Sequence, residues 1–169
     1  MRRVLVVLTL CAASLSLPAQ TGDAPFGWLL RGSNPQNYHA GVEANTAFLA
    51  SNSNLENTGI FGTLLQTVSA QNYAGKRVRF HASVRSENVT GWAGLWFRAD
   101  KGKGTVAFEN MEKRPIKGNT EWKNYDIVLD IPADTTSLYY GALVAGSGKI
   151  WIDHVVLEPI GSQVSTPGI

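Results

Sequence analysis

Hydrophobic and polar residues alternate in short runs along most of this chain. Such alternation predicts β-strands, because successive side chains of a strand point to opposite faces of a sheet. Between the runs lie Gly, Asn, Pro and Asp residues, which favour tight turns. Helix signals do not recur. The pattern predicts strands at residues 61–69, 77–86, 91–99, 105–111, 123–131, 138–145 and 149–158.

The faces of these runs indicate how the strands pack. In residues 77–86 and again in residues 123–131, the apolar positions lie on one face and most of the opposite positions are polar. Strands of this kind form sheets that are covered on one side and wet on the other. We therefore predict an all-β fold, a two-sheet antiparallel β-sandwich. Residues 27–31 and 38–50 also fit strands, whereas residues 51–59 indicate a loop.

Residues 91–99 form the run with the most unusual outer face. Its inner face is apolar, while its outer face carries Trp92, Gly94, Trp96 and Arg98. The glycine predicts a gap where a ligand can approach, and two indoles with a guanidinium suit stacking and hydrogen bonding with a flat polar ligand. The alternative is that the tryptophans are covered by a loop, as is common for tryptophan on a sandwich strand. The two tryptophans are four residues apart, so about 13 Å of strand separates them, enough to meet a short oligosaccharide at two points.

The next predicted strand adds polar candidates to this binding face. Whichever of Glu109 and Asn110 faces outward is expected to contact the ligand, with Arg114 at the rim. Such a face suits an oligo- or polysaccharide, whereas a protein interface would favour a larger apolar patch with a charged rim. Two functions stay open, a sugar-binding module and an interaction or scaffold domain that meets a protein partner. Arg98 also has a plainer interpretation, as an ion-pair partner of Asp100 or Glu109.

The N-terminus has the layout of a secretory signal peptide. Arg2 and Arg3 precede an apolar run, and Ala19 supplies a small residue for cleavage. The run is shorter than the ~20 apolar residues that span a bilayer, so no membrane span is expected. Cys11 suggests acylation as an alternative, but Leu10 is larger than the residue that such sites prefer. The sequence thus predicts a secreted or periplasmic protein.

Removal of residues 1–19 changes the charge balance. The full chain has 15 basic and 13 acidic residues, and loss of Arg2 and Arg3 leaves 13 of each. A neutral chain without a basic cluster argues against nucleic acid or an anionic membrane as partner. The one cysteine leaves as well, so no disulfide is expected. We expect a linker at residues 20–25, one domain at residues 26–160 and a disordered tail at residues 161–169.

Catalysis is disfavoured by the arrangement of the acidic residues. A glycosidase needs two carboxylates directed at one bond. Glu109 and Glu112 are three apart, so in a strand they face opposite ways, and Asp126 and Asp130 lie on an ordinary outer surface with a valine between them. The chain has no nucleophile elbow and no zinc-protease motif. The prediction is that the protein is not an enzyme.

Several motifs together resemble one group of protein modules. They lie at residues 26–28, 32–33, 73–76, 121–125, 128–132 and 150–158. The chain resembles non-catalytic carbohydrate-binding modules of the galactose-binding-like jelly-roll type over residues 26–160. It is most similar to an uncharacterised bacterial secreted subset, marked by Gly91-Trp-Ala-Gly-Leu-Trp and by residues 110–116. The resemblance implies a jelly roll and a sugar-binding function, and it leaves the ligand open because such folds bind many partners.

The resemblance also implies a structural calcium ion near the ends of the first and last strands. Glu43 and Asp153 are the carboxylates that this sequence offers, and hard oxygen ligands suit that ion. Modules of this type commonly end with two adjacent acids, whereas the second position here is His154. Asp153 has an alternative role, in which it caps a turn or accepts backbone hydrogen bonds. No other cofactor is expected.

Overall fold

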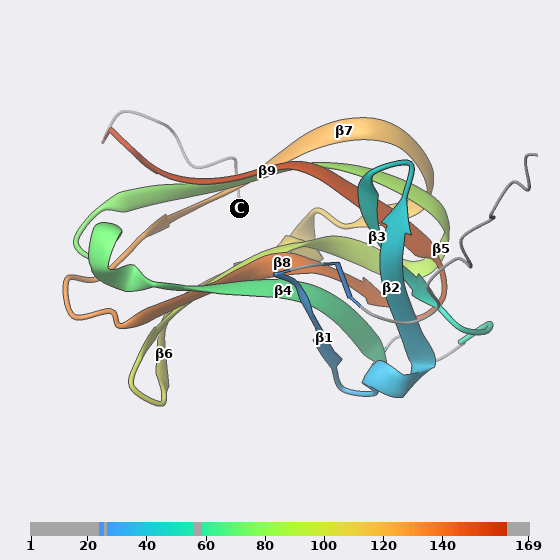
Figure 1. Ribbon diagram of the computed structural model, residues 1–169, viewed down its shortest axis with the longest axis horizontal. Coiled ribbons are helices and arrows are strands. Elements are labelled where there is room, and N and C mark those ends of the chain that lie inside the picture. The colour runs from blue at the N-terminus through green and yellow to red at the C-terminus, as the bar shows by residue number, and fades with distance from the viewer. Residues whose placement is uncertain (1–23, 26, 56–58, 162–169) are drawn as a thin grey trace, which may run out of the picture.

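One long strand, β5 (Arg77–Lys101), belongs to both layers of the fold (Figure 1). The computed structural model describes residues 24–25, 27–55 and 59–161. Their strands form two facing layers, and every strand pair is antiparallel. The N-terminal half of β5 pairs in one layer and its C-terminal half in the other. The predicted all-β antiparallel sandwich is confirmed.

Among the described strands, each of the two layers is a five-membered sheet to which β5 contributes one of its halves. The first sheet contains, in spatial order, β1 (Leu29–Gly32), β4 (Phe61–Ser69), β8 (Ser137–Ala145), the C-terminal half of β5 and β6 (Gly104–Asn110). The second sheet contains β2 (Tyr38–Glu43), β3 (Thr46–Ser51), β9 (Lys149–Ile160), the N-terminal half of β5 and β7 (Ile116–Asp130). Short 3-10 turns connect some of the strands: η1 (Pro35–Asn37), η2 (Ala70–Asn72) and η3 (Met111–Lys113).

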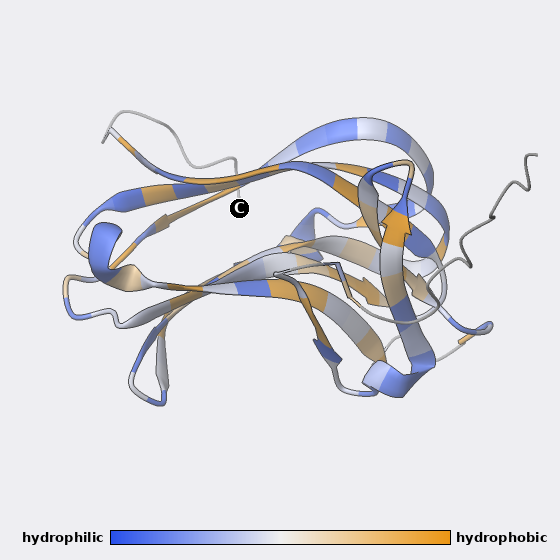
Figure 2. Ribbon diagram, viewed as in Figure 1, coloured by the Kyte–Doolittle hydropathy of each residue, from blue (hydrophilic) through white to orange (hydrophobic). Residues whose placement is uncertain are grey.

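The hydrophobic core lies between the two sheets, where apolar side chains alternate with polar ones along the strands (Figure 2). Both halves of β5 contribute to it. Phe80 comes from the second-sheet half and Phe97 from the first-sheet half, and their rings meet edge to face at 6.3 Å. Tyr140 of β8 packs against Phe80 at 5.1 Å. Aromatic contacts of this geometry add to the stability gained from burial.

The side chains of β5 change direction between its two halves. Even-numbered residues such as Phe80 point into the core in residues 77–84, whereas odd-numbered residues such as Phe97 do so in residues 93–99. A regular strand keeps a period of two, so the change requires an irregularity. Register shifts against β7 occur between Val84 and Ala93. These bulges turn the outer face of residues 92–98 away from the core.

Two predicted boundaries were wrong. Residues 77–86 and 91–99 were expected as separate strands, but the chain between them keeps pairing with β7 and β9, so one strand results. β7 begins at Ile116 rather than at residue 123, because residues 117–119 form a bulge and not a chain-reversing turn. Gly118 lies opposite Val89 in this bulge. Its φ of 64° lies in the left-handed region, which glycine adopts more readily than residues with a side chain.

Three predicted segments fall outside the described residues, in whole or in large part. These are the signal peptide at residues 1–19, the linker at residues 20–25 apart from its last two positions, and the tail beyond residue 161. Within the described part of the chain, no helix is long and apolar enough to cross a membrane.

The close pairing of β4 and β8 yields a stability prediction. A Cβ added at Gly141 would lie 2.0 Å from the carbonyl oxygen of Leu64, a backbone atom that cannot move aside. We expect Gly141→Ala to lower the free energy of unfolding by about 3 kcal/mol, measured by urea denaturation. Gly104→Ala is the control, because its Cβ would be 3.7 Å from its nearest neighbour. Equal stability of the two variants would contradict the packing described.

Candidate functional site

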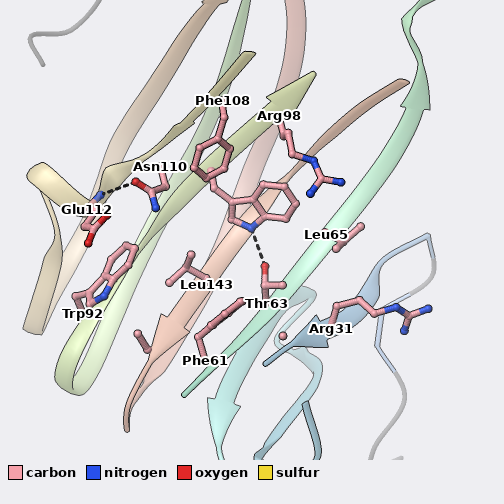
Figure 3. A pocket seen from close by; sticks show the side chains of 13 residues that line it. Arg31, Phe61, Thr63, Leu65, Trp92, Arg98, Phe108, Asn110, Glu112 and Leu143 are labelled. Carbon is pink, nitrogen blue, oxygen red and sulfur yellow. Dashed lines mark hydrogen bonds between the residues drawn. The ribbon is translucent and has the colours of Figure 1, made fainter. Parts of the chain in front are cut away.

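An open cavity lies on the outer face of the first sheet, on the side away from the second sheet. It encloses about 500 Å³ and is lined from β1, β4, β5, β6, β8 and the turn η3. β1 and β6 flank this face in Figure 1. Its floor is apolar and its rim is polar (Figure 3). The floor residues are Phe61, Leu65, Trp96, Leu143 and Ala145, and the rim residues are Arg31, Arg98, Asn110 and Glu112.

Trp96 forms part of the floor rather than an exposed platform. Only 8% of its surface is accessible, and it packs against Leu143 and Leu65. Its indole Nε1 donates a hydrogen bond of 2.7 Å to Oγ1 of Thr63, which itself donates to the carbonyl oxygen of Ala142 at 2.8 Å. Two neighbouring strands therefore hold the ring in one orientation. Of the two interpretations of this tryptophan, a stacking platform and a covered ring, the structure shows the covered ring, because β4 and β8 lie against it.

The predicted gap at Gly94 is also closed. A Cβ at this position would lie 2.8 Å from the Cβ of Met111, at the start of η3. Met111 is buried, and its sulfur lies 3.3 Å from the backbone nitrogen of Leu95. Gly94 thus makes room for the turn that follows β6, and not for a ligand.

Two aromatic side chains flank the floor on the side of β5 and β6. Trp92 is half-buried, at the start of the first-sheet half of β5, and Phe108 is 52% exposed on β6. Phe108 lies opposite Arg98 in the ladder between β5 and β6. Figure 3 shows both aromatic rings at the edge of the cavity, with Asn110 between them. The accessible aromatic surface is therefore supplied by Trp92 and Phe108.

Arg98 is held in place by its neighbours. Its Nη2 lies 3.0 Å from Oδ2 of Asp100, and its guanidinium stacks over the ring of Tyr139 at 4.5 Å. Asp100 is buried. The plainer interpretation of Arg98 as an ion-pair partner of Asp100 is confirmed, yet the side chain also lines the cavity. A guanidinium fixed by a carboxylate and an aromatic ring still has donors for a further acceptor.

The structure separates the polar candidates of β6. Asn110 lines the cavity, and its side-chain oxygen accepts a 3.3 Å hydrogen bond from the backbone of Glu112. Glu109 points to the other face of β6, where it pairs with Arg114 at 3.1 Å. Arg114 also donates to the carbonyl oxygen of Asp126 at 2.6 Å. Glu109 and Arg114 are thus not part of the cavity, because adjacent residues of a strand face opposite ways.

Glu43, a predicted calcium ligand, is engaged by other groups. Its carboxylate accepts hydrogen bonds from Nζ of Lys149 at 2.6 Å and from Nε1 of Trp151 at 3.0 Å. The hydrogen bond from Lys149 holds the pKa of Glu43 below its ordinary value, against a smaller opposing effect of burial. Asp153 accepts a hydrogen bond from the backbone nitrogen of His154 at 2.7 Å, as in its alternative role.

No described residues form a cluster of three or more His, Cys, Asp and Glu side chains with metal-binding geometry. A calcium ion at Glu43 and Asp153 stays a prediction.

Sequence reasoning missed several cavity residues. Phe108 shares a face with Asn110, two positions away, so strand alternation alone points to it. Arg31 and Thr63 reach the site from β1 and β4, which are far from residues 91–99 in sequence. Glu112 follows the end of β6, in the turn η3. No local pattern in the sequence indicates that these three residues approach Trp96.

No family model matches this chain. Among curated proteins it is similar to an uncharacterised HTH-type transcriptional regulator, YbfP, of Bacillus subtilis (strain 168). The two are 33% identical over an alignment of 150 residues, and the match covers 85% of this chain and 51% of the regulator. The chain therefore spans about half the length of that relative.

Solved structures share the fold at low sequence identity. The C-terminal family 22 carbohydrate-binding module of Clostridium thermocellum Xyn10B superposes with a TM-score of 0.56 at 13% identity, covering 83% of this chain and 89% of the module. TmCBM61, solved in complex with β-1,4-galactotriose, superposes with a TM-score of 0.51 at 15% sequence identity, and the match covers 79% of this chain and 88% of that module. A Stig cyclase of Fischerella sp. TAU superposes with a TM-score of 0.55 at 15% sequence identity, and the match covers 88% of this chain and 93% of the cyclase. The predicted jelly roll is confirmed as a fold.

Burial of Trp96 leads to a second stability prediction. Truncation of a buried aromatic side chain removes packing and leaves a cavity, so Trp96→Ala is expected to lower the free energy of unfolding by about 3–5 kcal/mol. Trp122→Ala is the control: Trp122 is 44% exposed on β7, and its loss should change stability by less than about 0.5 kcal/mol. Chemical denaturation measures both. An unchanged midpoint for Trp96→Ala would show that the ring is exposed.

The ion pair of Glu43 predicts a pH-dependent difference. A carboxyl whose folded pKa is lowered contributes stability above its unfolded pKa of about 4.3, and this contribution is lost as the pH falls through the folded pKa. Because Glu43 is half exposed, we expect Glu43→Gln to lower the free energy of unfolding by less than about 1 kcal/mol at pH 7. Urea unfolding from pH 7 to pH 3 should show the difference vanish. A constant difference would contradict the ion pair.

Proposed function

We propose that the cavity on the first sheet binds an oligo- or polysaccharide, and that the protein is a non-catalytic, secreted recognition module. The observation that carries the proposal is the combination of accessible aromatic surface at Trp92 and Phe108 with polar side chains around one open cavity. A sugar ring has C–H groups on its faces, which pack on aromatic rings, and hydroxyl groups at its edge, which need donors and acceptors.

The polar rim supplies both kinds of hydrogen-bonding group. Arg31 and Arg98 are donors, Glu112 is an acceptor, and the amide nitrogen of Asn110 is a donor while its oxygen is bound to the backbone of Glu112. The volume of about 500 Å³ falls within the usual range for small-ligand sites. Since Trp96 is fixed in the floor by Thr63, little of the site has to be ordered on binding.

The comparisons support a recognition role. Carbohydrate-binding modules share the jelly-roll fold, and the regulator YbfP is similar to this chain over about half of its own length. The likeness to a cyclase shows that other proteins with this fold can be enzymes, but the described residues that line the cavity include one carboxylate, Glu112. General acid–base cleavage of a glycosidic bond needs two.

A glycan array followed by calorimetric titration tests the proposal. We expect at least one oligosaccharide to bind, with affinity that rises with chain length. Phe108→Ala should weaken binding about tenfold or more, because the exposed ring loses its stacking contact, a loss of about 1.4 kcal/mol. Its 52% exposure means that the substitution should leave the fold intact, which thermal unfolding checks.

Trp122→Ala is the matched control, because it removes an exposed aromatic ring from the second sheet. It should bind the same oligosaccharide as the parent protein does. Equal binding by Phe108→Ala and the parent, or no binding of any glycan, would contradict a sugar site in this cavity.

A further inference from the structure

The charges around the cavity are unevenly distributed. Its lining contains three charged side chains, Arg31, Arg98 and Glu112. Figure 3 shows Arg31 and Arg98 on one side of the cavity with Leu65 between them, whereas Glu112 lies on the other side beside Trp92. The site therefore has a cationic end, defined by Arg31 and Arg98, and an acidic end.

The charge of Arg31 is not balanced by any carboxylate in the described part of the chain. Its one hydrogen bond there is a 2.8 Å donation from Nη1 to the carbonyl oxygen of the adjacent Leu30, and the side chain is exposed. Arg98 differs, because Asp100 neutralises it from behind. Among the described residues, the cationic end thus carries one positive charge without a carboxylate partner, from a guanidinium that retains most of its five donors.

We propose that the saccharide bound here is acidic, a glycan whose sugar carries a carboxylate, and that this carboxylate sits at the cationic end. This inference rests on the proposed sugar-binding function. A planar carboxylate matches the fork of donors on a guanidinium and forms charge-assisted hydrogen bonds. Leu65 and Trp96 line the same cavity as the two arginines, so an apolar surface lies beside the donors. A neutral sugar would offer Arg31 no charge-assisted hydrogen bond.

Uronate oligosaccharides and their carboxyl-reduced forms provide the matched ligands. The probes are oligomers prepared from pectate, alginate and hyaluronan, each tested beside the neutral form in which the carboxylate is reduced to an alcohol. We expect at least one acidic oligomer to bind about tenfold or more tightly than its reduced form, because a hydrogen bond between charged groups is stronger than one to an alcohol. Its affinity should also fall with added salt.

Variants at Arg31 test the residue assignment. Arg31→Gln should weaken binding of the acidic oligomer about tenfold and bring it to the level of the reduced form. Arg31→Lys keeps the charge but not the fork, so its affinity should lie between the two. Lys103→Gln, at the exposed turn between β5 and β6, removes the same charge outside the cavity and should have no effect. Arg98 is unsuitable, because its removal would leave the buried Asp100 without a cation.

Each outcome decides the inference. If acidic and reduced oligomers bind equally and Phe108→Ala weakens both, the sugar site stands and its acidic specificity is wrong. If Arg31→Gln binds the acidic oligomer as tightly as the parent, the carboxylate does not sit at the cationic end. If no oligomer of either kind binds, the acidic specificity falls together with the proposed function.

Discussion

The rest of the structure depends on one constraint in β5: the core-facing residues change from even-numbered in its N-terminal half to odd-numbered in its C-terminal half. This strand provides a core wall for both sheets, with Phe80 in one half and Phe97 in the other. If the strand kept a strict period of two, residues 92–98 would bury the indoles and the guanidinium and expose the aliphatic face. The bulges before Ala93 prevent this, at the cost of some regular pairing with β7. The cavity exists because the strand is irregular at that point.

The outer faces of the two sheets differ in how far their aromatic rings are covered. On the second sheet, Trp151 and Phe48 are covered by cations: Lys149 lies 4.2 Å from the Phe48 ring and 4.5 Å from Trp151, and Arg85 lies 4.5 Å from Trp151. Glu43 balances Lys149. The rings of Phe48 and Trp151 are thus about nine-tenths buried. On the first sheet, Phe108 is 52% exposed at the edge of the cavity, so this face offers accessible aromatic surface beside it.

Local patterns predicted the strands, the antiparallel sandwich and the common face of Trp92, Trp96 and Arg98, because these depend on alternation within one run. What they could not predict depends on contacts between distant strands. The burial of Trp96 results from Thr63 and Leu143, and the cationic end requires Arg31 to approach from β1. Glu109 differs from these residues. Alternation already requires Glu109 and Asn110 to face opposite sides of the strand, and the register of β6 then decides which of the two lines the cavity.

The hairpin of β5 and β6 has a consequence for how modules of this architecture can diversify. Among the described strands, β6 pairs with β5 alone, and its turn at residues 101–104 is exposed. Residues can therefore be added to or removed from this ribbon in pairs without disturbing either layer of the core. The floor, in contrast, is tied to the packing of three strands. Evolution or protein engineering can thus reshape the wall that carries Phe108 for new ligands, while the floor is inherited almost unchanged.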